Sequence, residues 1–224
     1  GLCIGAIPTR EDSADVLISK NGLHLSELKH GAVIGTSSLR RGAQIRHARP
    51  DIIIVPLRGN VETRLKKLQT ENMDAVVLAA AGVKRLNLEY RITEYLDPGI
   101  MLPAVGQGAL SIEIRQNDPD IQSIIKTLDD PPTRAIVAGE RAFLNYLGGS
   151  CQVPIAGHGE IKRNTFSLTG LVADLDGSRI LKATLSGSTD STESIGIRLA
   201  QQLLDQGADK ILDKLQLMES ANHG

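Results

Sequence analysis

Short apolar runs alternate with amphipathic stretches of about ten residues between residues 31 and 88. Apolar runs of four or five residues are typical of strands, and the stretches between them carry apolar side chains at helical spacing. Strands that alternate with helices usually pair in parallel, so the pattern predicts a mainly parallel sheet covered on both faces, with ligands at the carboxyl ends of the strands. The predicted strands span residues 32–35, 52–55 and 75–79, and the predicted helices span residues 38–48, 61–70 and 82–88.

A second pattern begins at the glycine-rich segment Pro103–Gly108, which predicts a hinge or crossover before an apolar run at residues 109–114. Residues 118–147 predict two helices broken at Pro131–Pro132, and Asp176–Gly177 is typical of a hairpin turn. The whole pattern predicts the α/β class: a β/α domain with a hinge that resembles a periplasmic binding protein, followed by a small α+β domain with a three-stranded sheet. The strands of that sheet are expected at residues 154–159, 166–173 and 180–186, with a helix at 192–204.

Composition narrows the function classes. The 224 residues are 41% hydrophobic, enough for one large or two modest domains, and the net charge of -1 indicates no general affinity for nucleic acid. Three tyrosines, two phenylalanines and no tryptophan offer few stacking platforms for single-stranded nucleic acid. Two distant cysteines and five scattered histidines give no metal signature and fit a reducing, cytoplasmic compartment, and no apolar run is long enough to span a membrane.

The near-neutral total charge hides a local group of arginines. The segment Thr36–Arg41 follows a predicted strand and opens a predicted helix, so backbone amides, the Ser38 hydroxyl and the guanidinium groups of Arg40 and Arg41 converge there. Cations in the first turn of a helix oppose its dipole at a cost of about 0.3–1 kcal/mol each. Two of them at this position therefore predict a compensating negative ligand.

The next strand end repeats the arrangement. Leu57–Asn60 includes Arg58 and Gly59, and Asn60 is placed to cap a helix whose first turn carries Arg64. Guanidinium groups bind carboxylates and phosphates in bidentate fashion. The chain has neither a GxGxxG after a strand nor a GxxxxGK(S/T) motif, so a polycarboxylate is favoured over a nucleotide.

Other basic residues of this region have simpler interpretations. Arg46 and Arg49 are expected on a solvated helix face. Lys84 and Arg85 follow the third predicted strand, where an anion site and an ordinary helix terminus explain them equally well.

Cys151 leaves three alternatives open. A lone cysteine in an apolar context is usually a small buried residue. Gly148 and Gly149 follow a predicted helix as a C-cap would, which places Cys151 on a turn where it can serve as a nucleophile or as a covalent anchor. The nearest histidine in sequence, His158, lies on the outgoing predicted strand, so spacing alone does not decide.

Five motifs, in order and spread along nearly the whole chain, resemble the porphobilinogen deaminase (hydroxymethylbilane synthase) family. They are TSSLRR at Thr36–Arg41, LRGNVETRL at Leu57–Leu65, AAAGVKRL at Ala79–Leu86, LPAVGQGAL at Leu102–Leu110 and GGSCQVPIAG at Gly148–Gly157.

The resemblance implies a cytoplasmic, monomeric transferase of tetrapyrrole (porphyrin and haem) biosynthesis. Such an enzyme joins four molecules of porphobilinogen head to tail, with release of ammonia, to give hydroxymethylbilane. It implies a dipyrromethane cofactor linked through Cys151, porphobilinogen as the small-molecule partner, and neither a metal, nor nucleic acid, nor a membrane. The positions that match the family's cofactor and substrate site are Thr36, Ser38, Arg40, Arg41, Arg58, Gly59, Arg64 and Arg85.

The chain departs from the family pattern in one respect. The family's catalytic aspartate lies in a His-Ser-Met-Lys-Asp-Val-Pro type motif, which this sequence does not contain, and Asp12 and Asp15 match a later, non-catalytic segment. The resemblance places that aspartate upstream of Gly1, so we expect no catalytic residue in this chain, most of the first domain absent, and little or no turnover. The expected division is residues 1–12 as a remnant of domain 1, 13–103 as domain 2, 104–129 as hinge and return segment of domain 1, and 130–224 as domain 3.

Two rival classes remain at the level of sequence. A binding module for a carboxylated small molecule would explain the arginines and the hinge, but it needs no thiol anchor. A cysteine hydrolase would need a histidine close to Cys151. Neither explains five motifs together.

Overall fold

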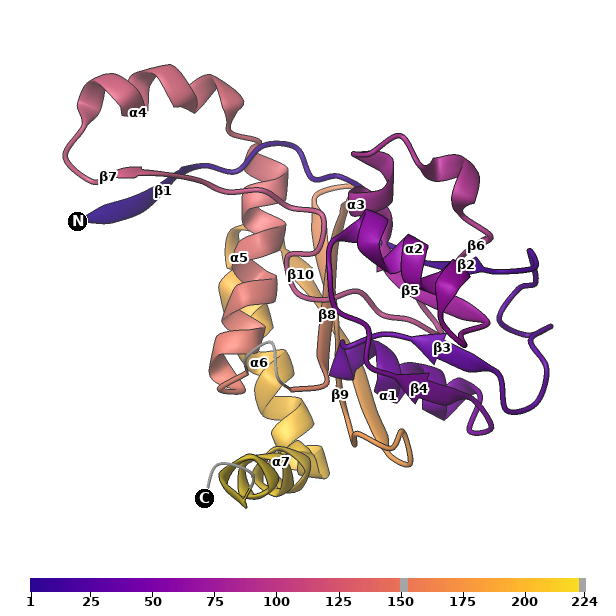
Figure 1. The fold of residues 1–224 in the computed structure, drawn as a ribbon. Coiled ribbons are helices and arrows are strands. Elements are labelled where there is room, and N and C mark those ends of the chain that lie inside the picture. The colour runs from indigo at the N-terminus through magenta and orange to yellow at the C-terminus, as the bar shows by residue number, and fades with distance from the viewer. Residues whose placement is uncertain (150–152, 222–224) are drawn as a thin grey trace.

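The structure, a computed structural model, describes residues 1–149 and 153–221, and within them the strands form three sheets. A five-stranded sheet is built from the first half of the chain, and a three-stranded sheet from the second half. A two-stranded ribbon pairs the start of the chain with its middle (Figure 1).

The five-stranded sheet is mixed rather than mainly parallel. Its order is β4-β3-β5-β2-β6, in which β3 pairs in parallel with β4 and β5, whereas β2 is antiparallel to both β5 and β6. The prediction of a mainly parallel sheet was wrong on the β2 side. Strand β2 leads to β3 through residues 20–32, which contain no helix that would return the chain in the parallel direction. The strands are β2 (Asp15–Ser19), β3 (Val33–Gly35), β4 (Ile53–Val55), β5 (Ala75–Ala79) and β6 (Glu94–Tyr95).

Helices cover both faces of this sheet, as the alternating pattern predicted. Strand β2 divides its side chains between them: Leu17 joins the core around Ile45 of α1, whereas Val16 and Ile18 join the core around Leu68 of α2. The helices are α1 (Leu39–Ala48), α2 (Val61–Thr70) and α3 (Ala80–Lys84), the last followed by a 3-10 turn at Glu89–Arg91. Helix α3 begins and ends earlier than predicted because β5 passes into it directly at Ala79.

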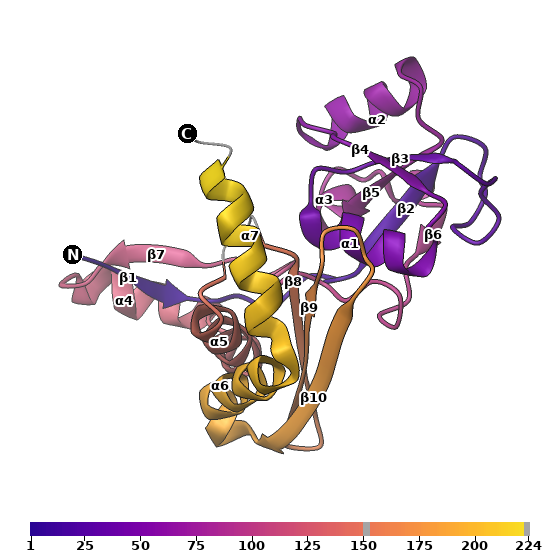
Figure 2. The ribbon, with the colours of Figure 1, turned by 90° about the horizontal axis from the view of Figure 1, so that it is seen from below.

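The three-stranded sheet is an antiparallel meander of β8 (Ile155–Lys162), β9 (Thr165–Ala173) and β10 (Ile180–Ser188). Helices α5 (Pro131–Tyr146), α6 (Thr192–Leu203) and α7 (Asp209–Ala221) lie together on one side of it (Figure 2). Phe143 and Phe166 fill the core between helices and sheet. Helix α7 was not predicted.

Helices α5 and α6 cross closely because two glycines meet at the crossing. A Cβ on Gly196 would lie 2.2 Å from the carbonyl oxygen of Gly139, and a Cβ on Gly139 would lie 2.7 Å from the Phe166 ring. At the end of α5, Gly148 takes a left-handed φ of 64°, in agreement with the predicted C-cap.

The ribbon of β1 (Leu2–Ala6) and β7 (Ile112–Arg115) extends away from the other sheets together with α4 (Pro119–Ile125) and a 3-10 turn at Lys126–Leu128 (Figure 1). Strand β7 starts later than predicted: residues 105–108 form turns with Gly106 and Gly108 at positive φ, and pairing with β1 begins only at Ile112.

Polar contacts join the two larger sheets. The hairpin between β9 and β10 lies against α1, where His47 Nδ1 is 2.8 Å from the Gly177 carbonyl oxygen and Arg46 donates to the Leu175 carbonyl at 2.9 Å. Gly177 has the positive φ expected of the predicted turn. No helix among residues 1–149 and 153–221 is both long and apolar enough to cross a membrane.

Candidate anion-binding site

The candidate site lies where β3 ends and α1 begins. Ser38 is the N-cap of α1, and its hydroxyl accepts a hydrogen bond from the Arg41 backbone amide at 3.4 Å. The buried Thr36 hydroxyl accepts from the Ser38 backbone amide at 3.2 Å, and the Ser37 hydroxyl accepts from the backbone amide of Leu57. Two neighbouring strand ends are thus joined here.

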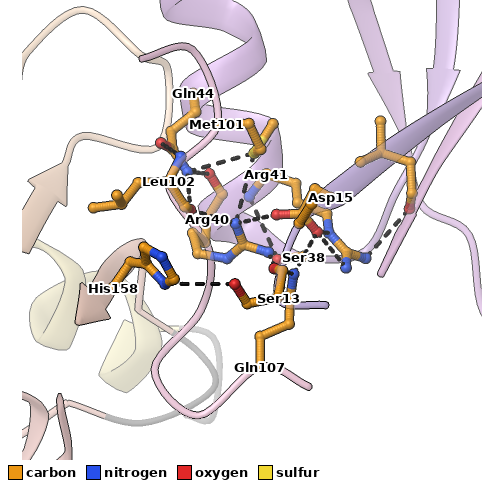
Figure 3. Close-up of polar contacts among 12 residues, drawn as sticks. Ser13, Asp15, Ser38, Arg40, Arg41, Gln44, Met101, Leu102, Gln107 and His158 are labelled. Carbon is orange, nitrogen blue, oxygen red and sulfur yellow. Dashed lines mark hydrogen bonds and ion pairs between the residues drawn. The ribbon is translucent and has the colours of Figure 1, made fainter. Parts of the chain in front are cut away.

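Arg40 and Arg41 both turn inward and meet the same carboxylate, that of Asp15 at the start of β2 (Figure 3). Arg40 Nη1 donates to Asp15 Oδ2 at 2.7 Å and to the Leu102 carbonyl at 2.7 Å. Arg41 Nε donates to Asp15 Oδ1 at 2.8 Å, its Nη2 lies 2.7 Å from the same oxygen, and its Nη1 donates to the Val77 carbonyl. The expected negative partner of the two arginines is therefore, in the first place, an internal one.

This internal partner leaves the cluster positive. Arg40 is 5%, Arg41 7% and Asp15 0% exposed, so two cations and one anion lie almost entirely out of water. Burial alone raises the pKa of Asp15, but the charges of Arg40 and Arg41 outweigh it and hold that pKa below its usual value. Burial lowers the pKa of Arg41, as does the charge of Arg40, against the opposing effect of Asp15. A buried excess of one positive charge is costly unless a further anion balances it.

The hinge segment predicted at residues 103–108 contacts the same cluster. Gln107 donates from Nε2 to Asp15 Oδ1 at 3.1 Å and to the Ser13 carbonyl at 2.6 Å, and its Oε1 accepts from Arg40 at 3.2 Å. Gln44 of α1 accepts from the Leu102 amide at 2.8 Å and donates to the Leu102 carbonyl at 3.1 Å. The amides of two glutamines thus fix the segment to α1 and β2.

The second strand end brings Arg64 toward this cluster and leaves Arg58 exposed. Arg64 Nε donates to the Gly59 carbonyl at 2.8 Å, and its charge is near enough to lower the pKa of Arg41. Gly59 has a φ of 123°, and a Cβ there would lie 2.7 Å from the Thr63 side chain, so the turn requires glycine. Arg85 is exposed at the C-cap of α3, and no contact in the structure joins it to Arg40 or Arg41.

Arg46 and Arg49 do not lie on a solvated helix face, and that prediction was wrong. Both are half-buried: Arg46 donates to the β9–β10 hairpin, and Arg49 donates to the carbonyls of Leu25 and Leu28 as well as to Asp51. Carbonyl groups at chain turns hold these guanidinium groups, and helical periodicity carries no signal of such contacts.

A second buried ion pair lies behind the first and was missed. Glu140 of α5, which is fully buried, accepts from Arg10 Nη1 at 2.7 Å and also from the backbone amides of Gly106 and Gly159. His158 faces this pair, with Nδ1 3.9 Å from Glu140 Oε1. Here one cation meets one anion, whereas two cations, Arg40 and Arg41, share the single carboxylate of Asp15.

Gly1 is not part of this site. The family's catalytic aspartate is expected upstream of Gly1. Gly1 is exposed directly before β1, and its carbonyl accepts from the Gln116 backbone amide at 3.0 Å, which continues the pairing of β1 with β7. Among the residues that the structure describes, no hydrogen bond joins Gly1 to Arg40, Arg41 or Asp15. The place of the catalytic aspartate therefore stays a prediction from the motifs.

The three alternatives for Cys151 stay open, since Cys151 lies outside the described residues. His158 is engaged by other groups: its Nδ1 is 3.5 Å from the Ser13 hydroxyl and its Nε2 is 3.6 Å from Glu160. Among the residues described, no three His, Cys, Asp or Glu side chains come together as a metal site requires.

A mixed α/β sheet with buried arginines at its strand ends is the arrangement of an α/β protein with an anion site at the carboxyl ends of its strands. Comparison with known families is more specific. Residues 1–123 match the family described as "Porphobilinogen deaminase, dipyromethane cofactor binding domain", and residues 135–205 match "Porphobilinogen deaminase, C-terminal domain". The chain belongs to the porphobilinogen deaminase family, as the motifs predicted.

Several curated relatives carry the same name. The porphobilinogen deaminase of Syntrophotalea carbinolica is 49% identical over 217 residues, which are 97% of this chain and 69% of that protein. The one of Bacillus subtilis is 49% identical over 218 residues, or 96% of this chain and 69% of the relative. The porphobilinogen deaminase of Brevibacillus brevis is 50% identical over 213 residues, which are 95% of this chain and 68% of the relative.

Similarity to solved structures adds nothing to this. One solved structure comes from a study titled "Molecular and structural basis of glutathione import in Gram-positive bacteria via GshT and the cystine ABC importer TcyBC of Streptococcus mutans". The matched region is 63% of this chain and 56% of the other chain, with 11% sequence identity and a TM-score of 0.32. That similarity is too low to support a common fold, and the likeness to periplasmic binding proteins stays a prediction.

Proposed function

We propose that this chain carries the cofactor and substrate carboxylate site of a porphobilinogen deaminase. Family membership makes the enzyme type a transferase of tetrapyrrole biosynthesis with a dipyrromethane cofactor. The finer proposal is head-to-tail joining of four porphobilinogen units into hydroxymethylbilane, with loss of ammonia at each step. The observation that carries it is the buried pair Arg40 and Arg41, whose two positive charges meet the single carboxylate of Asp15.

The residues present fit a dipyrromethane. Each pyrrole unit of such a molecule carries carboxylate side chains, and a carboxylate is the anion that two guanidinium groups with one internal partner still lack. Arg40 and Arg41 are proposed to bind carboxylates at the start of α1, with Thr36 and Ser38 shaping the turn. Arg58, Gly59, Arg64 and Arg85 are proposed to bind further carboxylates. When bound, the cofactor supplies the primer to which substrate units are added.

The protein's own part in this proposal is binding, orientation and exclusion of water. The near-complete burial of Arg40 and Arg41 strengthens their attraction for a carboxylate, because few water dipoles screen it. The N-terminus of α1 adds its backbone amides to the same region. An elongating chain with many carboxylates calls for several cations, and exposed ones such as Arg58 are proposed to serve together with the buried pair.

The cofactor attachment and the domain division belong to the same proposal. Cys151 is proposed to attach the cofactor, on the strength of the motif GGSCQVPIAG. Residues 13–103 are proposed as domain 2, residues 130–224 as domain 3, and residues 1–12 with 104–129 as parts of domain 1. The pairing of β1 with β7 supports the grouping of those last two segments. The sequence lacks the Lys-Asp motif that supplies the family's catalytic aspartate, so we expect no turnover from these 224 residues alone.

Binding of porphobilinogen to the purified chain tests the carboxylate site. Isothermal titration calorimetry should detect binding, and Arg40→Leu should weaken it at least tenfold, because one lost charge-assisted hydrogen bond is worth about 1.5–3 kcal/mol. Arg115→Leu is the matched control, since Arg115 lies in β7 with 81% of its side chain exposed. Equal affinities of Arg40→Leu and the control would contradict the site.

The attachment site has a separate test. Intact mass of the chain purified from cells that make porphobilinogen should exceed the sequence mass by one dipyrromethane, and Cys151→Ala should have the sequence mass alone. An adduct that persists in Cys151→Ala would place the attachment elsewhere, and no adduct on either chain would remove support for attachment. Release of ammonia from porphobilinogen by the purified chain would contradict the expectation of no turnover.

A further inference from the structure

We propose that Asp15 is a positioning residue, which holds Arg40 and Arg41 in the orientation that a ligand carboxylate requires. The inference rests on the proposed function, because it concerns the same arginines. Asp15 itself is not expected to touch the ligand, since its carboxylate is fully buried and both oxygens are already engaged.

The contacts of Asp15 determine the direction of both guanidinium groups. One oxygen accepts from Arg40, and the other accepts from Arg41 and from Gln107 (Figure 3). Arginine is a long side chain with many rotamers, and ordering it during binding reduces affinity. A carboxylate that fixes two arginines in advance removes this cost from the binding step.

The same contacts leave donors for a ligand. Arg40 donates to Asp15, to the Leu102 carbonyl and to Gln107, which accounts for three of the five N–H groups of a guanidinium. Arg41 engages Asp15 through Nε and Nη2 and donates through Nη1 to the Val77 carbonyl, which again accounts for three. Both arginines therefore keep donor capacity while their planes are held.

A purely structural role explains this arrangement less well. Buried ion pairs add little net stability compared with apolar residues. In the other buried pair of the described residues the charges are equal in number, since Glu140 meets Arg10 and completes its contacts with backbone amides. Asp15 instead holds two cations, which leaves the positive charge that a ligand can balance.

The test separates the effect of the Asp15 charge on ligand affinity from the effect of Asp15 on the orientation of the two arginines. Asp15→Asn keeps the size of the side chain but loses its charge and one of its acceptors, and we expect porphobilinogen to bind to the folded variant at least tenfold more weakly than to the unchanged chain. Asp15→Glu, which restores the carboxylate, should recover part of the loss. The matched control is Asp51→Asn, because Asp51 also forms a two-bond ion pair with an arginine, Arg49, away from the site; its affinity should be unchanged.

The direction of the change in affinity shows whether Asp15 positions the arginines or only lowers the positive charge around them. Loss of a negative charge beside two cations would, by itself, tighten carboxylate binding, so equal or tighter binding by folded Asp15→Asn would overturn the inference. Circular dichroism measures the folded fraction against which affinities are corrected. If Arg40→Leu abolishes binding and Asp15→Asn does not change it, the proposed function stands and the positioning role fails. If Arg40→Leu has no effect, the proposed function fails first.

A second variant covers the case in which Asp15→Asn does not fold. Gln107→Ala removes one contact to Asp15 and one to Arg40 but leaves every charge in place. This variant should bind porphobilinogen more weakly than the unchanged chain. The affinities of the two chains should change with salt concentration in the same way, because their charges are the same. Unchanged affinity would overturn the inference.

Discussion

At the scale of single residues, sequence patterns predicted which arginines cluster at the candidate site but not their partners. Arg40, Arg41 and Arg64 are visible because they occur at predicted strand ends, where cations near a helix N-terminus are unfavourable. Asp15 lies 25 residues from Arg40 along the chain, in a segment whose carboxylates resemble those of any polar loop. The pairing of β2 with β5 brings them together, and that neighbour relation has no local signal.

Glu140→Gln should destabilise the protein strongly. The change leaves the guanidinium of Arg10, whose side chain is only 10% exposed, without its counter-charge. Breaking a buried ion pair by removal of one partner costs about 3–5 kcal/mol. Urea denaturation measures the difference in the free energy of unfolding, with Glu113→Gln on the exposed side of β7 as control. A loss no greater than that of the control would show that Arg10 is satisfied by other groups.

His158 should make stability depend on pH in the mildly acidic range. Burial lowers the pKa of His158, and Arg10 lowers it further, against the opposing charges of Glu140 and Glu160. The unfolded chain keeps a histidine pKa of about 6.5 and so takes up a proton that the folded chain resists. The free energy of unfolding is therefore expected to fall as pH decreases below about 6.5, until the lower folded-state pKa is reached.

Urea denaturation at several pH values between about 7.5 and 5.5 measures this effect. His158→Gln should flatten the pH dependence, whereas His30→Gln, at an exposed position, should retain it. An identical slope in His158→Gln and the unchanged chain would assign the effect to other groups.

At the scale of elements, local signals placed most helix boundaries well. Ser38 and Asn60 cap α1 and α2, and Pro131 and Pro132 begin α5 rather than interrupt it, as expected for residues without a free amide donor. Strand β2, strand β6, which has two residues, and helix α7 were missed. Helix α7 follows α6 after a single turn, in which Gly207 has a φ of 98°. Apolar residues of both helices pack in the same core, but the chain changes direction between them. Hydrophobic periodicity gives no sign of that change.

Gly196→Ala should destabilise the α5–α6 pair. A methyl group there would lie 2.2 Å from the Gly139 carbonyl, so the helices must separate or shift. Overpacking of this kind costs about 1–3 kcal/mol. The matched control is Gly82→Ala in α3, where the nearest atom is 3.4 Å away and alanine favours the helix by about 1 kcal/mol. Thermal unfolding should move to lower temperature for the first variant alone; equal shifts would mean that the crossing adapts.

At the scale of the whole molecule, sequence patterns predicted two larger units joined by a hinge, and the contacts between them could not be predicted. Residues 105–108 of the segment predicted as a hinge form turns, and Gln107 ties this segment to the arginine cluster. The role of the segment as a hinge stays a prediction. The joining contacts, from Arg10 to Glu140 and from His47 to Gly177, cross more than 120 residues of chain. Each depends on the orientation of complete sheets, which no window of sequence contains.

Gly177→Ala should weaken the contact between the β9–β10 hairpin and α1. A Cβ at this position would lie 2.6 Å from both the Ala43 carbonyl oxygen and the His47 amide nitrogen. Gly22→Ala is a close control, because Gly22 has nearly the same φ, 72° against 74°, with nothing within 4 Å of the added carbon. Both variants bear about 1–2 kcal/mol of backbone strain. Denaturation followed separately in the two sheets should show extra loss for Gly177→Ala only; equal losses would mean that the hairpin moves aside.

Helix α1 has a different neighbour at each end: its first turn holds Arg40 and Arg41, and its last turn contacts the hairpin tip at Gly177. The number of residues between β9 and β10 therefore sets where the tip of the hairpin meets the last turn of α1. Surface hairpins commonly vary in length among relatives, but here an inserted residue would press on a helix whose opposite end we propose as the carboxylate site. Among enzymes of this family that keep this packing, the hairpin between residues 173 and 180 should consequently be constant in length.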